Sequence, residues 1–260
     1  MIGRGAVGSV VARSLRDGNV PGAELAGLLA RSGPSGRPDT DDLPLITLHE
    51  ALREADLVVE CANQQVVKDV GARILTAGTD LMIISVGALA DDMTATALRA
   101  AGPGRLYASS GAIGGLDVLR AAARCAPFER ITVTITKQPY ALVQSWMDAR
   151  EAARLRVATE PIEVFRGPAR ETADRFPECT NVAAAVALAV GDWAVVEVVI
   201  IADPAARPSV HEVVADGLAG TYRFGIVSRP SPERESSSMV TPYAVLSAIS
   251  DLTGRDFTFR

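Results

Sequence analysis

The chain has 260 residues, which is longer than an average single domain and suits a large α/β fold with a second unit attached. A hydrophobic content of 48% and a mean hydropathy of +0.19 are typical of a folded protein, and they exclude extensive disorder. The 26 basic and 31 acidic residues give a formal charge of −5, which excludes a strongly basic surface for nucleic acid or an anionic membrane. We expect no membrane-spanning segment.

The three cysteines lie far apart and form no C-x-x-C pair. This spacing predicts neither a disulfide framework nor a metal site, and it is typical of a protein from the reducing cytoplasm.

The first 110 residues alternate between strand-like and helix-like patterns. We expect strands at 24–30, 56–62, 80–86 and 106–109, and helices at 6–16, 48–55, 66–77 and 91–101. Thr47 and Glu50 are spaced as a capping box at the start of the second of these helices. Strands that alternate with helices in this way predict a Rossmann-type, doubly wound parallel sheet.

The pattern changes after residue 111. Residues 130–137 alternate apolar residues with threonines, which predicts a strand with one exposed face. Further segments are expected to form strands at 161–165, 195–201 and 222–227, a helix at 182–189 capped by Asn181, a polar loop at 230–238 and a helix at 243–252.

We therefore predict an α/β fold with two domains. Residues 1–110 form the dinucleotide-binding domain, and residues 111–239 form a smaller α/β catalytic and oligomerisation domain with an open, mainly antiparallel sheet. The helix within residues 240–255 is expected to return to the first domain.

A glycine-rich motif opens the chain. It fits G-x-G-x-x-G, and the residues that we expect to bind a dinucleotide here are Gly3, Gly5, Ala6, Val7 and Gly8. The motif alone is equally compatible with a flexible turn, but the strand–helix alternation that follows favours nucleotide binding. Only two residues precede the motif, where a central strand of about five residues normally stands. Either the chain begins downstream of the natural start or the sheet lacks most of this strand; we favour the first.

The cofactor should be selected at the end of the second strand. No carboxylate stands there to bind the ribose 2′-hydroxyl of NAD, whereas Arg31 could bind the 2′-phosphate of NADP. The alternative is that Arg31 only ends a strand at the surface. We expect NADP or NAD as the cofactor.

Several motifs past residue 84 occur in a distinctive order. They are S-V-G-A-L at 85–89, S-G-A-I-G-G-L-D at 110–117, F-R-G-P-A at 165–169, F-P-E-C-T-N-V-A-A at 176–184, I-A-D-P at 201–204 and V-H-E-V at 210–213. The ordered set resembles the L-aspartate dehydrogenase family over nearly the whole chain.

The resemblance implies NAD(P)-dependent oxidation of L-aspartate to iminoaspartate, which can hydrolyse to oxaloacetate and ammonia or feed NAD biosynthesis. It also implies that His211 is the catalytic histidine, that Ala112 and Asn181 contact the cofactor, and that the protein is a homodimer or a higher homo-oligomer. The changes at Ser209 and at 234–238, where the family has other residues, leave two alternatives: a dehydrogenase for another small amino or oxo acid, or a non-catalytic NAD(P)-binding protein.

The chemistry points to a histidine independently of the family. Amine oxidation and imine hydrolysis each need a group that titrates near neutrality, and the imidazole pKa of about 6.5 suits this. Of the two histidines, His49 is expected at the surface and His211 in a loop after a strand.

Binding a dicarboxylate needs cationic or hydroxyl donors. The candidates are Lys137, Ser237 and Ser238. Lys137 could equally end a strand at the surface, and the serine run, which begins at Ser236, could be only a flexible loop.

Overall fold

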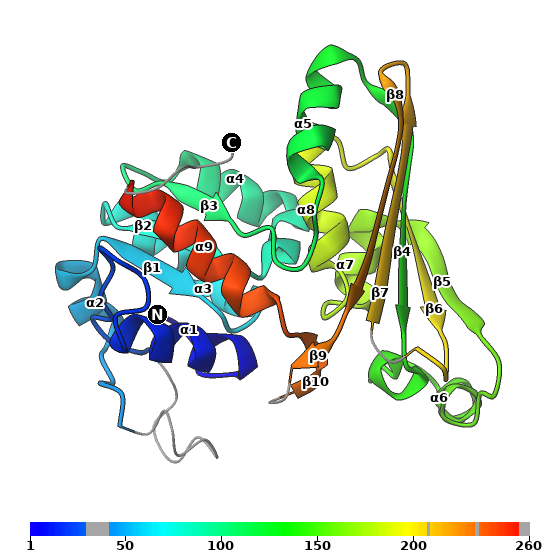
Figure 1. Ribbon diagram of the computed structural model, residues 1–260, viewed down its shortest axis with the longest axis horizontal. Helices are drawn as coiled ribbons and strands as arrows, with labels where there is room; N and C mark the ends of the chain where they lie inside the picture. Colours follow the sequence, from blue (N-terminus) through cyan, green and yellow to red (C-terminus); the bar gives the residue numbers. More distant parts are fainter. Residues whose placement is uncertain (30–41, 207–208, 232–233, 255–260) are drawn as a thin grey trace. The chain divides into compact units, whose positions relative to one another are not determined.

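A computed structural model describes residues 1–29, 42–206, 209–231 and 234–254. The chain divides into two compact units (Figure 1). The first unit comprises Met1–Gly111 and Thr241–Arg260, and the second comprises Ala112–Val240. No helix within the described ranges is both long and apolar enough to cross a membrane.

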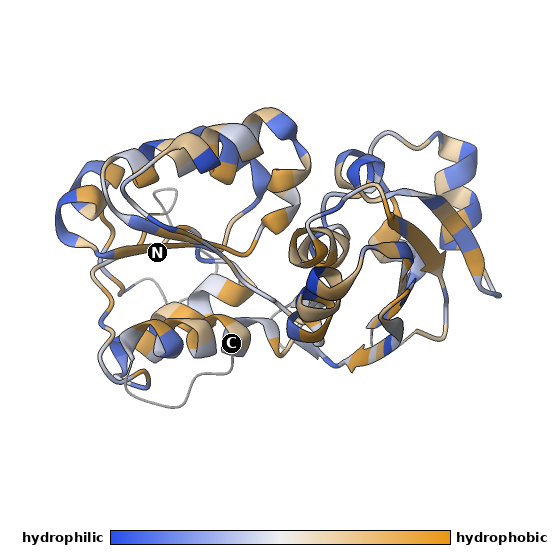
Figure 2. Ribbon diagram, turned by 90° about the horizontal axis from the view of Figure 1, so that it is seen from above, coloured by the Kyte–Doolittle hydropathy of each residue, from blue (hydrophilic) through white to orange (hydrophobic). Residues whose placement is uncertain are grey.

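The first unit is an α/β layer structure, as the sequence predicts. Figure 2 shows its hydrophobic strands between two layers of helices. In chain order its elements are α1 (Ala6–Arg16), α2 (Leu48–Glu54), β1 (Leu57–Glu60), α3 (Gln64–Thr76), β2 (Asp80–Ile83), the 3₁₀ helix η2 (Val86–Ala90), α4 (Asp92–Ala100), β3 (Leu106–Ala108) and α9 (Thr241–Thr253). The four helices predicted before residue 110 are all present.

The sheet of the first unit has the strand order of a doubly wound dinucleotide-binding fold. Strands β1, β2 and β3 are parallel neighbours. Ile2 forms parallel bridges with both Leu29 and Glu60, and Leu28 forms one with Leu45. We number the bridged segments at Ile2, Leu28–Leu29 and Leu45 as strands 1 to 3, and β1, β2 and β3 as strands 4 to 6. The order across the sheet is then 3-2-1-4-5-6, and it reverses between Ile2 and β1.

The strand predicted at 24–30 is wrong in extent, because only Leu28 and Leu29 form bridges and residue 30 lies outside the described residues. The neighbouring segment, residues 1–3, makes few backbone hydrogen bonds with it: the Leu29 N–H donates to Met1 O at 2.7 Å and the Gly3 N–H donates to Leu29 O at 3.0 Å. A strand extends only as far as its neighbours can pair with it. Residues 1–3 nevertheless lie in the sheet, because the Ile2 N–H also donates to Val59 O at 2.8 Å.

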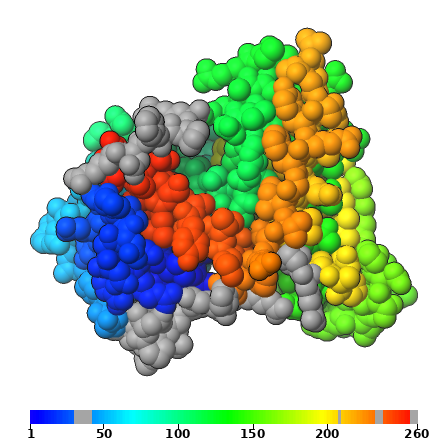
Figure 3. Space-filling view, in the orientation of Figure 1, coloured from blue at the N-terminus to red at the C-terminus, as the bar shows by residue number. Residues whose placement is uncertain are grey.

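Two local predictions concern helices of this unit. The Thr47 hydroxyl accepts from the Glu50 N–H at 3.2 Å and the Thr47 N–H donates to the Glu50 carboxylate at 2.7 Å, which confirms the capping box. The last helix, α9, buries Val245 and Ile249 in one cluster with Val11 of α1. Figure 3 shows α9 lying against α1, so the chain returns to the first unit after leaving the second.

The second unit contains an open five-stranded sheet. Its elements are α5 (Leu116–Cys125), β4 (Phe128–Lys137), the 3₁₀ helix η3 (Pro139–Leu142), α6 (Ala149–Arg156), β5 (Ile162–Pro168), α7 (Ala169–Arg175), α8 (Asn181–Val190), β6 (Val196–Ala202), β7 (Ser209–Gly217), β8 (Gly220–Ser228), β9 (Pro230–Ser231) and β10 (Arg234–Ser238). The strand order is β5-β6-β4-β7-β8, and only the β4–β6 pair is parallel. Helices α5, α7 and α8 lie on one face of this sheet (Figure 1).

Strand β4 has the alternation that its sequence predicts. Ile131, Val133 and Ile135 are buried, whereas the threonines between them are partly exposed. Strands β9 and β10 replace the predicted polar loop at 230–238, and they form a separate two-stranded sheet. Strand β7 was not predicted, because its mixed composition has no long apolar run.

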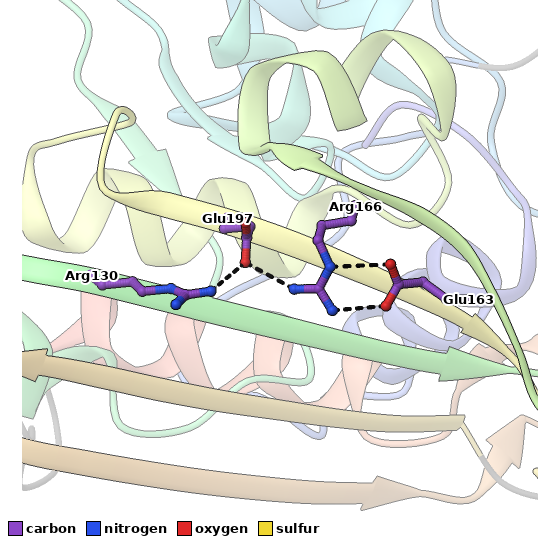
Figure 4. A network of polar contacts seen from close by, with 4 residues as sticks. All are labelled: Arg130, Glu163, Arg166 and Glu197. Carbon is purple, nitrogen blue, oxygen red and sulfur yellow. Dashed lines mark hydrogen bonds and ion pairs between the residues drawn. The ribbon is translucent and has the colours of Figure 1, made fainter.

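An ion-pair chain links three strands on the threonine face of the sheet (Figure 4). Glu197 of β6 pairs with Arg130 of β4 at 2.8 Å and with Arg166 of β5 at 3.0 Å, and Arg166 also pairs with Glu163 at 2.7 Å. The Arg130 and Arg166 guanidinium groups lower the pKa of Glu197. Exposed ion pairs of this kind add little to stability, so we assign these four linked side chains a role in strand alignment.

Candidate functional site

The glycine loop has two positions that only glycine can occupy. Gly3 has φ +91°, and a Cβ atom there would lie 2.8 Å from the Cys61 carbonyl oxygen. A Cβ atom at Gly8 would collide with the Gly3 carbonyl oxygen. Both glycines therefore allow the loop, the start of α1 and the end of β1 to pack closely.

Gly5 differs, because nothing lies within 4 Å of the position its Cβ would take. It is the N-cap residue of α1 and, as a glycine, has no side chain with which to cap the helix. The first turn, with Ala6, Val7 and Gly8, contains no acidic residue. It therefore presents N–H groups and the positive end of the helix dipole to open space, which fits a pyrophosphate.

The second unit places polar side chains at one corner of its sheet. His211 of β7 lies opposite Ile135 of β4, and Lys137 follows two residues later on the same face. Ser209 lies opposite Ser228 of β8, also at this end of the strands. His211 is 7% exposed and Lys137 8% exposed, so the corner is buried on the face that the helices cover.

Two polar atoms in the buried corner lack a hydrogen-bond partner among the described residues. Among the described residues, the Nδ1 atom of His211 and the Oγ atom of Ser228 are buried side-chain atoms with no hydrogen-bond partner. Burial, and then the positive charge of Lys137, lowers the pKa of His211 to about 4. The imidazole is therefore neutral at pH 7 and able to accept a proton, and the unpaired polar atoms call for a polar ligand.

The structure corrects two predictions about these residues. His211 is in a strand rather than a loop, because β7 pairs with both β4 and β8. Asn181 is the first residue of α8 and not its cap, because Thr180 takes the N-cap position. The Thr180 hydroxyl donates to the carbonyl oxygens of Phe176 and Thr172.

The other predicted site residues are spread over the chain. Ala112 begins the second unit. Ser237 and Ser238 are half-buried in β10, which belongs to a different sheet from Lys137 and His211. Arg31 lies outside the described residues. His49 is exposed on α2, as predicted.

Ser228 is the site residue that sequence reasoning missed. It ends the alternating run of Tyr222, Phe224 and Ile226, whose side chains face the helices. A serine in phase with three apolar residues was the available signal. Within the part of the chain that the structure describes, no group of three or more His, Cys, Asp or Glu residues could hold a metal ion.

The first unit has the strand order and the helix N-terminus of a dinucleotide-binding domain, and the second holds a neutral buried base beside a cation. Together they define an NAD(P)-dependent oxidoreductase. The comparisons agree: the family model "Homoserine dehydrogenase, NAD binding domain" matches residues 3–103, and "Aspartate dehydrogenase, C-terminal" matches residues 117–252.

Similar proteins identify the family. An L-aspartate dehydrogenase from Ruegeria pomeroyi is 36% identical over 259 residues, covering 96% of this chain and 90% of that protein. One from Methanosarcina acetivorans is 32% identical over 265 residues, covering 97% and 94%. The crystal structure of aspartate dehydrogenase from Thermotoga maritima matches with a TM-score of 0.72 at 28% identity, covering 99% of this chain and 97% of that one. The chain belongs to the L-aspartate dehydrogenase family, which confirms the resemblance seen in its motifs.

Proposed function

We propose that the protein oxidises L-aspartate to iminoaspartate with NAD or NADP, and that His211 is the acid/base. The observation that carries this proposal is the buried corner of Lys137, His211 and Ser228. There a cation lies at the same end of the strands as two buried side-chain atoms that have no hydrogen-bond partner among the described residues. A small dicarboxylate with an α-amino group would supply a partner to Lys137, to His211 and to Ser228.

Lys137 and Ser228 are the groups that we assign to the substrate carboxylates. Lys137 is 8% exposed, and its side chain makes no hydrogen bond or ion pair with any described residue, so an anion is the partner that its charge lacks. A carboxylate would supply that charge and a good acceptor for the Ser228 hydroxyl. Ser237 and Ser238 stay candidates from the sequence.

His211 acts on the proton of the substrate amine. Its pKa is lowered partly by Lys137, so a bound carboxylate, by offsetting that charge, would raise the pKa toward the operating range. The neutral imidazole then takes a proton from the α-ammonium group and releases it to solvent. Neutral again, it deprotonates the water that attacks the imine.

The nicotinamide supplies the hydride acceptor when the cofactor is bound. The residues that we propose to hold the cofactor are Gly3, Gly5, Ala6, Val7, Gly8, Ala112 and Asn181. Arg31 selects NADP in this proposal, so Arg31→Ala should weaken NADP more than NAD.

We further propose that the protein works in the cytoplasm as a homo-oligomer and can feed NAD biosynthesis. A second candidate function is a dehydrogenase for another small amino or oxo acid. The sequence feature that favours it is Ser209, two residues before His211, together with the changed segment 234–238.

A substrate panel separates these functions. L-aspartate should give the highest kcat/KM among small amino acids, and Lys137→Met and Ser228→Ala should each raise its KM about 10- to 100-fold, the loss expected for a hydrogen bond to a charged group. Lys68→Met is the matched control, because Lys68 lies on α3 of the first unit and pairs only loosely with Asp91 at 3.9 Å. A higher kcat/KM for another acid supports the second function. Folded, cofactor-binding protein without turnover on any acid refutes both.

A further inference from the structure

One buried carboxylate in the first unit is not used by the proposed chemistry. Glu60, the last residue of β1, is 1% exposed. Its carboxylate accepts the N–H groups of Ala62 at 2.7 Å, Ser85 at 3.0 Å and Ile84 at 3.3 Å, and the Ser85 hydroxyl at 3.0 Å. Glu60 thereby joins the turn after β1 to the turn after β2.

The negative charge of Glu60 is stabilised by hydrogen-bond donors and not by a cation among the described residues. Among the described residues no cation forms an ion pair with it. Burial raises the pKa of the carboxyl and the four donors oppose that rise. Three of the donors are backbone N–H groups, which can only donate, so both carboxylate oxygens must accept and the site suits the anion.

Glu60 stands where the strand order reverses. It bridges to Ile2, and the next residue, Cys61, is the one whose carbonyl oxygen lies against Gly3 of the glycine loop. Dinucleotides bind across this reversal, at the carboxyl ends of the strands, with one mononucleotide on each half of the sheet. The adenosine half is expected to bind at the strand before Arg31, so the nicotinamide half is expected to bind at the ends of β1, β2 and β3.

We propose that the buried charge of Glu60 makes the cofactor site favour the oxidised nicotinamide over the reduced one. The inference rests on the proposed cofactor site. Oxidised nicotinamide has one positive charge more than the reduced ring, whereas the pyrophosphate is common to both forms. The ratio of their affinities therefore isolates the effect of Glu60 on the ring.

The size of the effect follows from Coulomb's law. One unit charge acting on another at an effective dielectric of about 20, over separations on the order of 10 Å, changes an affinity roughly tenfold. A tenfold change in the ratio of affinities shifts the potential of a bound two-electron couple by about 30 mV.

The test compares three variants by equilibrium binding, with calorimetry for the oxidised cofactor and fluorescence for the reduced one. Glu60→Gln removes the charge at nearly constant shape, and Glu60→Asp keeps the charge but shortens the side chain. Glu54→Gln is the control, because this glutamate is on α2 in the same unit and its side chain is 56% exposed. Unfolding temperatures and circular dichroism report on the fold of each variant.

Glu60→Gln should weaken NAD⁺ relative to NADH, or NADP⁺ relative to NADPH, roughly tenfold, while Glu54→Gln and Glu60→Asp keep the wild-type ratio. An equal loss for both redox forms in Glu60→Gln overturns the inference and leaves Glu60 a purely structural residue. If Glu60→Gln does not fold, a tenfold change of the ratio in Glu60→Asp, which retains the charge, also overturns it. Wild-type protein that binds neither form refutes the cofactor site itself, whereas binding with this ratio but no turnover refutes only the proposed activity.

Discussion

Gly5 and Gly8 are three residues apart in one loop, yet alanine should impair cofactor binding at the first position and the fold at the second. At Gly5 the backbone has φ −72° and ψ −167°, which any residue adopts, and an added Cβ meets nothing within 4 Å. At Gly8 the added Cβ meets the carbonyl oxygen of Gly3. Gly5→Ala should therefore impair cofactor binding and leave the fold intact, whereas Gly8→Ala should impair the fold.

The magnitudes follow from these surroundings. Gly5→Ala changes stability by less than about 1 kcal/mol, because the loss of chain entropy in the unfolded state offsets a poorer helix cap. Its methyl group occupies the space for the pyrophosphate, and losing one hydrogen bond to a charged group costs about 1.5–3 kcal/mol, or roughly 10- to 100-fold in Kd. Gly8→Ala overpacks the loop at a cost of about 1–3 kcal/mol, which lowers Tm by several degrees.

The assay is the Kd for NAD⁺ and NADP⁺ by calorimetry, beside Tm without cofactor. The expected result is a weaker Kd with unchanged Tm for Gly5→Ala, and a lowered Tm for Gly8→Ala. A Gly5→Ala protein that binds cofactor as well as wild type refutes the assignment of the open space at the start of α1 to the pyrophosphate.

Two further predictions concern the second unit. The pKa of His211 falls to about 4 on folding, so between pH 6.5 and 4 the unfolded state binds more protons. The free energy of unfolding that neutral, buried His211 contributes is fully present above pH 6.5 and should decline by up to about 3 kcal/mol toward pH 4. Urea unfolding across this range should show a smaller decline for His211→Gln than for the wild type. Equal declines in the two proteins would contradict the burial of a neutral His211. Gly115 has φ +79° and a Cβ there would collide with the Phe224 ring, so Gly115→Ala should lower the unfolding free energy by about 1–3 kcal/mol. Gly114→Ala, where the added Cβ meets nothing within 4 Å, is its control and should unfold at the wild-type temperature.

Periodicity and capping signals predicted the local elements well. Helix α1 has the predicted bounds, Ala6–Arg16, and the Thr47 capping box forms as expected. The strand predicted at 24–30 was wrong in extent, because the length of a strand depends on its neighbours, which lie far away in the sequence. Strand β7 escaped prediction for the same reason, since pairing on both sides compensates for its polar residues.

Sequence motifs suggested candidate residues for the site but not how those residues are arranged. Apolar alternation in β4 puts Lys137 in phase with Ile135, but the sequence left a surface position equally open, and its burial is known from the structure. That His211 lies on the same face beside it depends on the β4–β7 register, which no local pattern encodes. Ser228 has no motif of its own: its phase with the apolar residues of β8 was the one sequence signal, and in the structure its hydroxyl has no hydrogen-bond partner among the described residues.

The central claim is that this chain removes a hydride from Cα of L-aspartate. The most direct measurement is to incubate the protein with NAD⁺ or NADP⁺ and L-aspartate deuterated at Cα, and to examine the reduced cofactor by mass spectrometry and proton NMR. We expect one deuterium at C4 of the nicotinamide, with the rate lowered roughly 100- to 10,000-fold in His211→Gln, as expected for loss of a general acid/base. Folded, cofactor-bound protein that forms no deuterated cofactor, or that forms it equally fast without His211, would contradict the account.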